Sequence, residues 1–403
     1  MKIVLYSINY FPELTGIGKY VGEMAEWLVM RGHQVRVVTA SPYYPGWVIS
    51  EGYSGCKYSR RKINGVDVFR CPLWVPRKPS GIKRLIHLAS FALTSAPAMF
   101  LQIFWKPDLV FVVEPPLFCA PFALLTSRLS HAKAWLHVQD FEVDAAFDLG
   151  IMNSNIMKNV VHNFEKFLMK RFDKVSTISS KMLEKLGNKG VEKSKTTFFP
   201  NWVDTRMIYP ISQSSMRANL GILENDIVCL YSGSMGEKQG LEILVDVARL
   251  LRNESNVHFV ICGNGPARDR LIVLGSDLCN IIWLPLQPID KLNDLLGIAD
   301  IHLLAQRADV ADLVLPSKLA GMLASGKPVI ATANPGTEIA LTLSQCGKVV
   351  EPGNALTLAN AILDLVRDGL GREALGIKGR MYALEYLNMN LVLSRFEKMA
   401  KEF

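Results

Sequence analysis

The same local order opens both halves of this chain: a β-rich run, a glycine-rich turn and then an amphipathic helix. In the first half these are residues 2–8, 15–18 and 20–30, and a second β-rich run follows at 35–39. In the second half they are residues 227–232, 233–240 and 240–252. Because a helix between sequential strands places those strands in parallel, this order predicts an α/β fold with a parallel sheet in each half.

Short apolar runs continue at intervals long enough for helices. They lie at 66–70, 109–113, 134–138 and 175–178, and again at 257–262, 281–284, 301–304, 329–331 and 348–350. A polar stretch at 209–215 separates the two series, and 403 residues are enough for two cores. We expect two Rossmann-like, doubly wound domains at 1–205 and 206–385, the first with six strands, and a C-terminal helix at 386–403 that packs back on the first. Ligands of such sheets bind beyond the carboxyl ends of the strands.

Basic residues are concentrated in the first half. Residues 1–204 hold 26 Lys and Arg against 16 Asp and Glu, a charge near +10, whereas the remaining 19 and 21 leave the second half near −2. This excess suggests an anionic partner for the first domain, such as a lipid headgroup, a diphosphate or nucleic acid, or else a solubilising surface. The sequence has no basic helix face with interleaved aromatic residues, which argues against nucleic acid.

The cysteines indicate a reducing compartment. All seven are scattered, without the short paired spacings of a zinc site or a disulfide framework. The apolar start at residues 1–6 is too short for a signal peptide and is typical of a strand. These features predict a cytoplasmic protein without a metal site.

One uncharged segment leaves three interpretations open. Residues 85–105 contain 21 consecutive positions without Asp, Glu, Lys or Arg, directly after a basic cluster at 77–84. That length can cross a bilayer, but several polar residues and the central Pro97 interrupt it. The segment is a membrane span, a helix in the interface of an anionic membrane, or a buried helix. The second interpretation predicts a peripheral protein on the inner face of the cytoplasmic membrane.

Two glycine turns are candidates for phosphate binding. Gly16 and Gly18, with Lys19 beside them, precede a helix whose free N–H groups favour an anion. The turn at 232–242 offers Gly233, Ser234, Gly236, Lys238 and Gln239, and Lys238 would neutralise a diphosphate leaving group. Neither turn completes a dinucleotide or P-loop signature, which argues against ATP hydrolysis. The alternatives are a plain tight turn and a solvated lysine.

Two further segments carry candidate side chains. Ser317 and Lys318, at the start of a predicted helix, would place a hydroxyl, backbone donors and an ammonium beside one phosphate, although Ser317 alternatively acts as a simple N-cap. His137, Asp140 and Asp144 follow the strand at 134–138, where they would position an acceptor hydroxyl or act as a base. The alternative for that segment is a solvated acidic loop.

These segments together resemble the GT-B fold and, within it, the retaining glycosyltransferase family four, over nearly the whole chain. The motifs similar to that family are YFPELTGIGKYVGEMAEWLVMRGHQVRVVTA, FFPNWVD, ICGNGP and LPSKLAGMLASGKPVIA. The longest match is to the branch that contains the colanic acid fucosyltransferases of enteric bacteria, through NYFPELTGIGKY, ASPYYP, QDFEVDA, FFPNW and GEKQGLE.

The resemblance implies an enzyme that needs no cofactor and no metal. Its second domain would hold a GDP- or UDP-sugar, and the branch with the longest match suggests GDP-fucose. Its first domain would hold a lipid-diphosphate-linked saccharide acceptor, in exopolysaccharide or O-antigen biosynthesis. The implied donor contacts are Gly16, Gly18, Gly233, Ser234, Lys238, Gln239, Gly263, Gly265, Ser317, Lys318 and Glu338. The implied catalytic residues are Asp140, Lys238 and His137.

The sequence departs from the family at a pair of glutamates eight positions apart. The matching positions here are Leu313 and Gly321, and Asp309 or Asp312 is the candidate substitute for the missing carboxylate. Two other functions therefore stay open, a non-hydrolysing nucleotide-sugar epimerase and an inactive transferase-like partner in a polysaccharide assembly complex.

Overall fold

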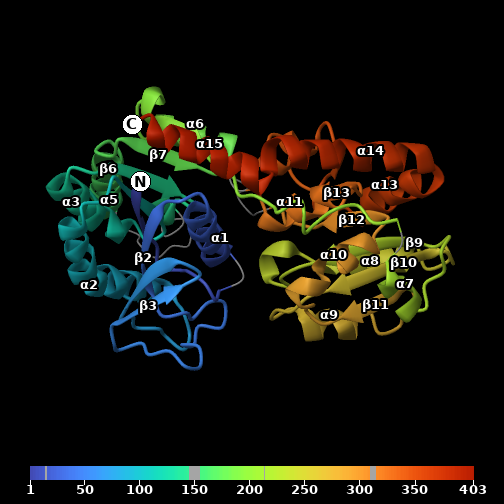
Figure 1. The fold of residues 1–403 in the computed structure, drawn as a ribbon. Helices are drawn as coiled ribbons and strands as arrows, with labels where there is room; N and C mark the ends of the chain where they lie inside the picture. The colour runs from blue at the N-terminus through green and yellow to red at the C-terminus, as the bar shows by residue number, and fades with distance from the viewer. Residues whose placement is uncertain (14–15, 145–154, 213, 309–314) are drawn as a thin grey trace. The chain divides into compact units, whose positions relative to one another are not determined.

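A computed structural model describes residues 1–13, 16–144, 155–212, 214–308 and 315–403 of the chain. They form two compact units, which consist of residues 1–199 with 393–403 and of residues 200–392 (Figure 1). The chain therefore passes between the units twice, at 199/200 and at 392/393, whereas we expected changes of domain after 205 and 385.

The first unit contains an eight-stranded sheet in the order β3-β4-β2-β1-β5-β6-β7-β8. Its strands are β1 Lys2–Tyr6, β2 Gln34–Ala40, β3 Ser59–Ile63, β4 Val66–Cys71, β5 Leu109–Glu114, β6 Lys133–Val138, β7 Lys174–Thr177 and β8 Thr196–Phe198. All neighbours pair in parallel except β3 and β4. The prediction of six strands was wrong by two edge strands, β3 and β8.

Helices cover this sheet on the connections between strands. They are α1 Gly16–Met30, α2 Gly81–Trp105, α3 Ala120–Ser130, α5 Asn155–Met169 and α6 Ser180–Asn188, with short 3₁₀ turns η1 Leu117–Cys119 and η2 Lys193–Lys195. Pro121 near the start of α3 and the Ser179 cap of α6, whose hydroxyl accepts the Met182 N–H at 3.1 Å, set where those helices begin.

The last helix, α15 Met389–Lys401, contributes its residues from Leu393 onward to the first unit. Phe396 is fully buried there, with its ring centroid 4.8 Å from that of Trp135 and 5.3 Å from that of Phe199. Nearby, the Glu397 carboxylate accepts hydrogen bonds from Lys401, His33 and Arg31 at 2.6, 3.0 and 3.2 Å. The C-terminal residues are thus part of the core of the first unit.

The second unit contains a six-stranded parallel sheet in the order β11-β10-β9-β12-β13-β14. Its strands are β9 Ile227–Ser232, β10 Val257–Cys262, β11 Ile281–Leu284, β12 Ile301–Leu304, β13 Val329–Thr332 and β14 Gly347–Val350. All six lie where the apolar runs predicted them, because strands covered on both faces are apolar at nearly every position.

One core lies on each face of this second sheet. The first packs beneath α8 Glu242–Leu250, α9 Arg268–Leu274 and α13 Ala355–Arg367. The other packs beneath α10 Leu292–Gly297, α11 Ser317–Ala324 and α12 Glu338–Leu343. The remaining elements are α7 Ser215–Asn219, α14 Gly369–Tyr382, the turns η3 Glu237–Gln239 and η4 Ile289–Lys291, and the π-helical turn η5 Ala383–Leu387. Helices on both faces of a parallel sheet confirm the predicted doubly wound architecture.

The two passages of the chain are hydrogen-bonded to each other inside the second unit. The Val203 N–H donates to the Leu387 carbonyl at 2.8 Å, and the Met389 N–H donates back to the Val203 carbonyl at 3.0 Å. The Arg380 guanidinium donates to three carbonyls of adjoining segments, those of Thr205, Ile208 and Ala324. These bonds fix the segment that enters the unit against the segment that leaves it.

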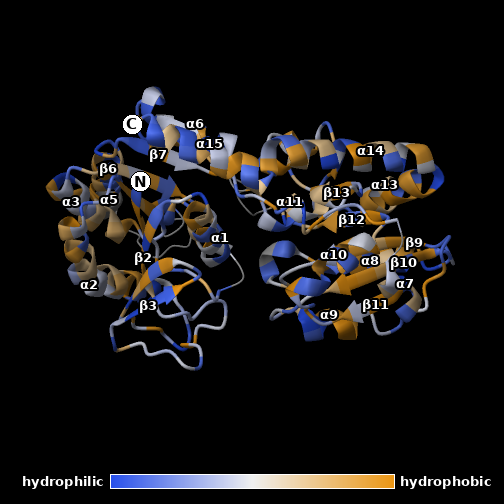
Figure 2. Ribbon diagram, viewed as in Figure 1, coloured by the Kyte–Doolittle hydropathy of each residue, from blue (hydrophilic) through white to orange (hydrophobic). Residues whose placement is uncertain are grey.

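The uncharged segment at 85–105 lies in α2, which is continuous through Pro97. Nine of its residues are buried, and the helix packs on β2, β4 and α3. Within the described residues α2 is long and apolar enough to cross a membrane, judged by length and composition alone. Figure 2 shows α2 and much of α3 in the colours of apolar residues. The structure thus presents α2 as part of the folded unit, with a remaining apolar strip on its outer side.

Candidate active site

Two glycine loops pack backbone against backbone at the carboxyl ends of β9 and β10. The Gly233 N–H donates to the Cys262 carbonyl at 3.0 Å, and the Met235 N–H donates to the Asn264 carbonyl at 2.9 Å. A Cβ atom on Gly263 would lie 1.9 Å from the Gly233 oxygen, and one on Gly265 would lie 2.4 Å from the Met235 oxygen. Only glycine fits there, so the structure brings together three glycines that we predicted separately.

Lys318 lies against the first of these loops. Its Nζ atom is 4.0 Å from the centroid of the Tyr231 ring, and its Cδ atom is 3.3 Å from where a Gly233 Cβ would be. The Tyr231 hydroxyl donates to the Ser234 carbonyl at 2.5 Å and so holds the loop in place. Burial lowers the pKa of Lys318 to about 7. An ammonium stacked on an aromatic face beside open backbone is suited to an anionic ligand.

Ser317 is the first residue of α11, and Pro316 occupies the cap position without a side-chain capping bond. The alternative interpretation of Ser317 as an N-cap was therefore wrong. Its side chain is exposed at the first turn of the helix, next to Lys318 in the chain. A hydroxyl, free N–H groups and an ammonium thus meet at one helix start.

The remaining donor candidates of this unit have different surroundings. The Gln239 side-chain oxygen accepts the Gly236 N–H at 3.0 Å and shapes the turn. Lys238 lies in the same turn, η3, but its side chain is outside the described residues. Glu338 begins α12 behind a Thr337 cap and is 6% exposed. The phosphate contacts predicted for these side chains stay predictions.

The glutamate-pair positions are only partly described. Leu313, Asp309 and Asp312 lie outside the described residues. Gly321 lies within α11, and a Cβ atom there would be 3.5 Å from a methyl group of Leu296. This position therefore packs toward α10.

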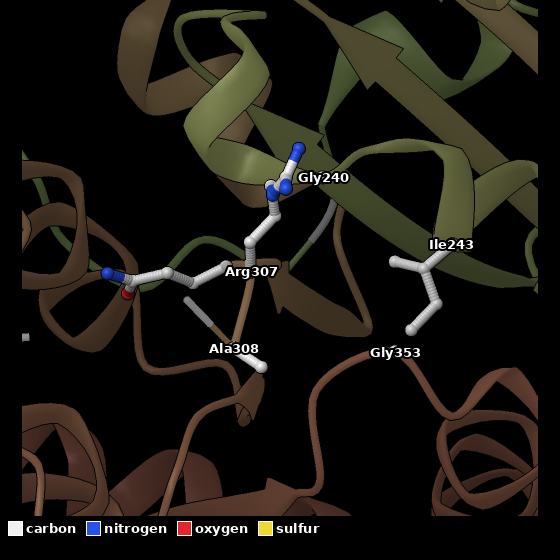
Figure 3. A pocket seen from close by; sticks show the side chains of 6 residues that line it. Gly240, Ile243, Arg307, Ala308 and Gly353 are labelled. Atoms are coloured by element: carbon white, nitrogen blue, oxygen red, sulfur yellow. The ribbon is translucent and has the colours of Figure 1, made fainter. Parts of the chain in front are cut away.

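A cavity of about 390 Å³ opens at the same edge of the second sheet. It is lined by Gly240, Ile243, Gln306, Arg307, Ala308 and Gly353. Figure 3 shows Arg307 and Ile243 on opposite sides of the opening. A Cβ atom on Gly240 would lie 2.7 Å from the Arg307 Cγ atom, so this glycine makes room for the arginine. We did not predict Arg307, although its place just beyond the apolar run at 301–304 was a signal.

In the first unit, Gly18 makes room for a carboxylate. A Cβ atom on Gly18 would lie 2.8 Å from the Cβ of Glu13. One Glu13 oxygen accepts the N–H groups of Tyr43 and Tyr44 at 2.8 and 2.9 Å, and the other accepts from Asn9 at 2.8 Å. Glu13, which sequence reasoning missed, thus joins two loops at this edge of the sheet. Gly16, with φ of 59°, begins α1, and its predicted contact with a diphosphate stays a prediction.

The residues predicted around β6 separate into two groups. His137 is 3% exposed; its Nδ1 lies 2.9 Å from the Ser176 hydroxyl, and its Nε2 lies 2.9 Å from the Gln139 amide nitrogen. Burial lowers the pKa of His137 to about 3, so this ring has the surroundings of a core residue. Asp140, by contrast, is exposed in the loop beyond β6. Of the two, Asp140 is placed to meet a ligand.

Asp144 belongs to a network of ion pairs. Its carboxylate lies 2.6 Å from the Lys185 ammonium and 3.1 Å from that of Lys189, which lies 2.5 Å from Glu165. Asp144, Glu165 and His162 are close enough to share a metal ion, with candidate ligand atoms within 4.8 Å of one another. The two ammonium groups already supply positive charge to these carboxylates, so the arrangement is that of a structural network.

Two further carboxyl groups lie near this network. Glu114, at the end of β5, is fully buried, and within the described part of the chain neither of its oxygens has a hydrogen-bond partner. Burial, and then the charge of Glu165, raises its pKa well above the ordinary value. Glu142 accepts the Leu117 N–H at 3.0 Å, and burial raises its pKa to about 7 although this bond and the charge of Arg84 lower it. Sequence reasoning missed Glu114.

Solved structures share this architecture over nearly the whole chain. Sucrose-phosphate synthase from Thermosynechococcus elongatus is 17% identical with a TM-score of 0.76, over 100% of this chain and 98% of its own. Anabaena HepE in complex with UDP-glucose is 15% identical with a TM-score of 0.70, over 100% of both chains. WaaG, a glycosyltransferase of lipopolysaccharide biosynthesis, is 16% identical with a TM-score of 0.66, over 98% of both. The fold is therefore the GT-B fold, as predicted.

Sequence comparison gives the family. Residues 15–202 match a glycosyl transferase 4-like domain, and residues 212–381 match glycosyl transferases group 1. The putative colanic acid biosynthesis glycosyl transferase WcaI of Escherichia coli K12 is 41% identical over 97% of this chain and 96% of its own length. N-acetyl-alpha-D-glucosaminyl L-malate synthase of Bacillus anthracis is 20% identical over 98% and 96%. The chain belongs to glycosyltransferase family four and is an enzyme that transfers sugars.

Proposed function

We propose that this enzyme transfers a sugar from a nucleoside diphosphate to a lipid-diphosphate-linked saccharide in polysaccharide biosynthesis. The observation that carries the donor half is the pair of interlocked glycine loops with Lys318 stacked beside them. The likeness to WcaI supports a polysaccharide pathway, and the UDP-glucose complex of HepE supports a nucleotide-sugar donor. The first donors to test are GDP-fucose and UDP-glucose.

The chemistry follows from the groups at this edge of the second sheet. As the sugar leaves, negative charge grows on the diphosphate, and preorganised N–H groups and ammonium groups stabilise it. Each such contact is worth roughly 2–4 kcal/mol in comparable oxyanion sites. The start of α11 and Lys318 are placed for this role, and we assign Lys238 to it as well. We propose a retaining, front-face attack in which no protein nucleophile takes part.

For the acceptor we propose a place beside Asp140. This carboxylate is exposed beyond the carboxyl end of β6, where ligands of such sheets bind. It would accept a hydrogen bond from the attacking hydroxyl. The buried His137 has no comparable access, so we leave it out of the proposed proton transfer.

The lipid part of the acceptor is supported by the outer strip of α2 and α3. The strip consists of exposed apolar side chains, which are Ile82, Ile86, Leu93, Phe100, Leu101 and Phe104 on α2 and Leu125 and Leu129 on α3. Phe104 is 84% exposed and Leu93 68%. An apolar strip of this kind on a packed helix suits the interface of a membrane, whereas water would oppose its exposure.

Basic residues lie at one end of this strip. Arg77, Lys78, Lys83 and Arg84 are exposed at and before the start of α2. Arg84 is near enough to Glu142 for its charge to lower the pKa of that carboxyl, and Glu142 follows Asp140 by two residues in the chain. Cations at this end would attract anionic headgroups or a lipid-linked diphosphate. We therefore propose that the enzyme works in the cytoplasm, on the inner face of the cytoplasmic membrane.

Turnover of the purified enzyme tests the donor assignment. Donor consumption is measured with and without a polyprenyl-diphosphate-linked saccharide. Lys238→Ala should reduce turnover about 100-fold with the fold intact, because one contact to the leaving diphosphate is lost. Lys291→Ala, at an exposed lysine of η4, is the matched control and should leave turnover unchanged. Unchanged turnover in Lys238→Ala would refute that assignment, and epimerised donor without transfer would replace the proposed reaction.

Flotation with vesicles tests the membrane surface. The wild-type enzyme should float with vesicles of phosphatidylcholine containing about one third phosphatidylglycerol, and less with phosphatidylcholine alone. Leu93→Glu with Phe104→Glu should abolish flotation. Leu370→Glu, at a residue of α14 that is 83% exposed, adds a charge outside the strip and should have no effect. Equal flotation of all variants would exclude the strip as the docking surface.

A further inference from the structure

We infer that Lys318, stacked on the Tyr231 ring beside the Gly233 loop, takes up a proton when the donor diphosphate binds, so that donor affinity falls as pH rises. This inference rests on the proposed donor site and assigns a pH dependence to it.

The first step is the place of the amine. Its neighbours are the ring of Tyr231 and the backbone of Gly233, which offer a π face and no full negative charge. Among the described residues no carboxylate forms an ion pair with Lys318. A charged ammonium in such a place has lost hydration without gaining a counterion, and the ring of Tyr231 compensates for only part of that loss, so burial favours the neutral amine.

The second step concerns the charged and titratable groups on the surrounding elements. Tyr231 on β9 remains neutral, because burial raises its pKa. On β12, His302 is neutral as well, because burial and then the charge of Lys327 lower its pKa to about 3. Elsewhere at this edge of the sheet, the Glu237 carboxylate already forms an ion pair with Arg270 at 3.0 Å. The described ion pairs thus leave Lys318 without a compensating anion.

A bound diphosphate changes this balance. It brings negative charge to the edge of the sheet and supplies the counterion that the ammonium lacks, so the pKa of Lys318 should return toward the ordinary lysine value. With a free pKa of about 7, a change to about 10.4 corresponds to uptake of about 0.9 proton at pH 8 and about 0.1 at pH 6. The same shift in the pKa of Lys318 should weaken the affinity for the nucleotide roughly 50-fold between pH 7 and pH 9.

Isothermal titration calorimetry of the full chain with GDP and with UDP measures this uptake. At pH 8 the titration is repeated in Tris and in HEPES, whose ionisation enthalpies differ. The slope of the observed binding enthalpy against the ionisation enthalpy of the buffer gives the number of protons taken up. The terminal phosphate of the nucleotide is already deprotonated at pH 8, since its last pKa is near 6. We expect about 0.9 proton for the wild-type enzyme with whichever nucleotide binds.

Two variants assign the proton to its residue. Lys318→Arg carries a permanent charge and should bind the nucleotide without proton uptake. Lys348→Arg makes the same exchange at a lysine of the edge strand β14 that forms an ion pair with Asp364. This variant should take up the same number of protons as the wild type. If Lys318→Arg fails to fold, the dissociation constant of the wild-type enzyme is measured from pH 7 to pH 9. A constant that does not rise over this range overturns the inference.

The outcomes are distinct. Nucleotide binding without proton uptake, or uptake that persists in Lys318→Arg, overturns the inference and leaves the proposed function standing. Absence of binding by both nucleotides overturns the proposed function itself. Binding with uptake that disappears only in Lys318→Arg supports both.

Discussion

Replacing Gly263 with alanine should separate the two interlocked loops of the second unit. The added Cβ would lie 1.9 Å from the Gly233 oxygen and 3.0 Å from its carbonyl carbon, at a residue with φ of 152°. No side chain can move aside to relieve this clash, because both partners are backbone. Relief requires moving the loop after β9, whose Gly233 N–H is bonded to Cys262 at 3.0 Å.

The magnitude can be worked out against a matched control. Gly221→Ala places alanine at φ of 69° with nothing within 4 Å of the new Cβ, so it costs only the backbone strain, about 1 kcal/mol. Gly263→Ala adds the clash, about 1–3 kcal/mol for overpacking in a rigid site. For a unit of this size the difference corresponds to a melting temperature roughly 2–12 °C lower than that of the control.

Hydrogen exchange followed by mass spectrometry localises the effect. Peptides that cover β9 and β10 should exchange faster in Gly263→Ala than in Gly221→Ala, and the stabilisation by GDP or UDP should disappear only in the former. If both variants exchange and melt alike, and both still bind nucleotide, the packing of the two loops does not have the importance that we assign to it.

Three further substitutions test the packing of each unit. Burial alone would raise the pKa of Glu397, but its three hydrogen-bond donors lower this pKa to about 2. The ionised carboxylate therefore stabilises the fold at pH values above its unfolded pKa of about 4.5. That stabilisation is lost as the pH falls from about 4.5 to 2. Glu397→Gln should flatten the acid limb of melting temperature plotted against pH by an amount equivalent to about 1–2 kcal/mol, because solvent around the exposed Arg31 and Lys401 screens part of the interaction. An unchanged limb would contradict this. Arg380→Met leaves three carbonyls without their donor and should lower the stability of the second unit by about 2–4 kcal/mol. If the variant melts at the same temperature as the wild type, this expectation is wrong. Lys189→Met should cost about 3–5 kcal/mol because the buried Glu165 loses its ion-pair partner, and the added change Glu165→Leu should restore part of that loss. Additive losses would argue against the pair.

Much of the fold could be predicted from the sequence because strands covered on both faces are apolar at most of their positions. The edge strand β14, with the sequence GKVV, is half polar, but the other five strands of the second sheet show that pattern. β3 does not, because its sequence SRRKI is mostly exposed at the edge of the first sheet, and charges there prevent edge-to-edge pairing. The three residues of β8 are too few to form a pattern.

The candidate site was predictable where local geometry decides it. Gly233 and Gly263 follow apolar runs directly, and a glycine at that point allows a tight turn. The stacking of Lys318 on Tyr231 is a tertiary contact between distant segments and leaves no local signal. His137 shows the opposite limit, because its position at a strand end suggested chemistry while its side chain points into the core. Family resemblance supplied the donor and acceptor assignments, which the proposed experiments test.

The discontinuous first unit has a consequence for how this protein is made. Residues 200–392 are contiguous, so the nascent chain can complete that unit as soon as they have left the ribosome. The N-terminal sheet emerges earlier but lacks Phe396, which packs against Trp135 and Phe199, until residues 393–403 have also emerged. The order of emergence is therefore not the order of completion, and ribosome-stalled chains that end at Val392 should expose the unfinished aromatic core to proteases.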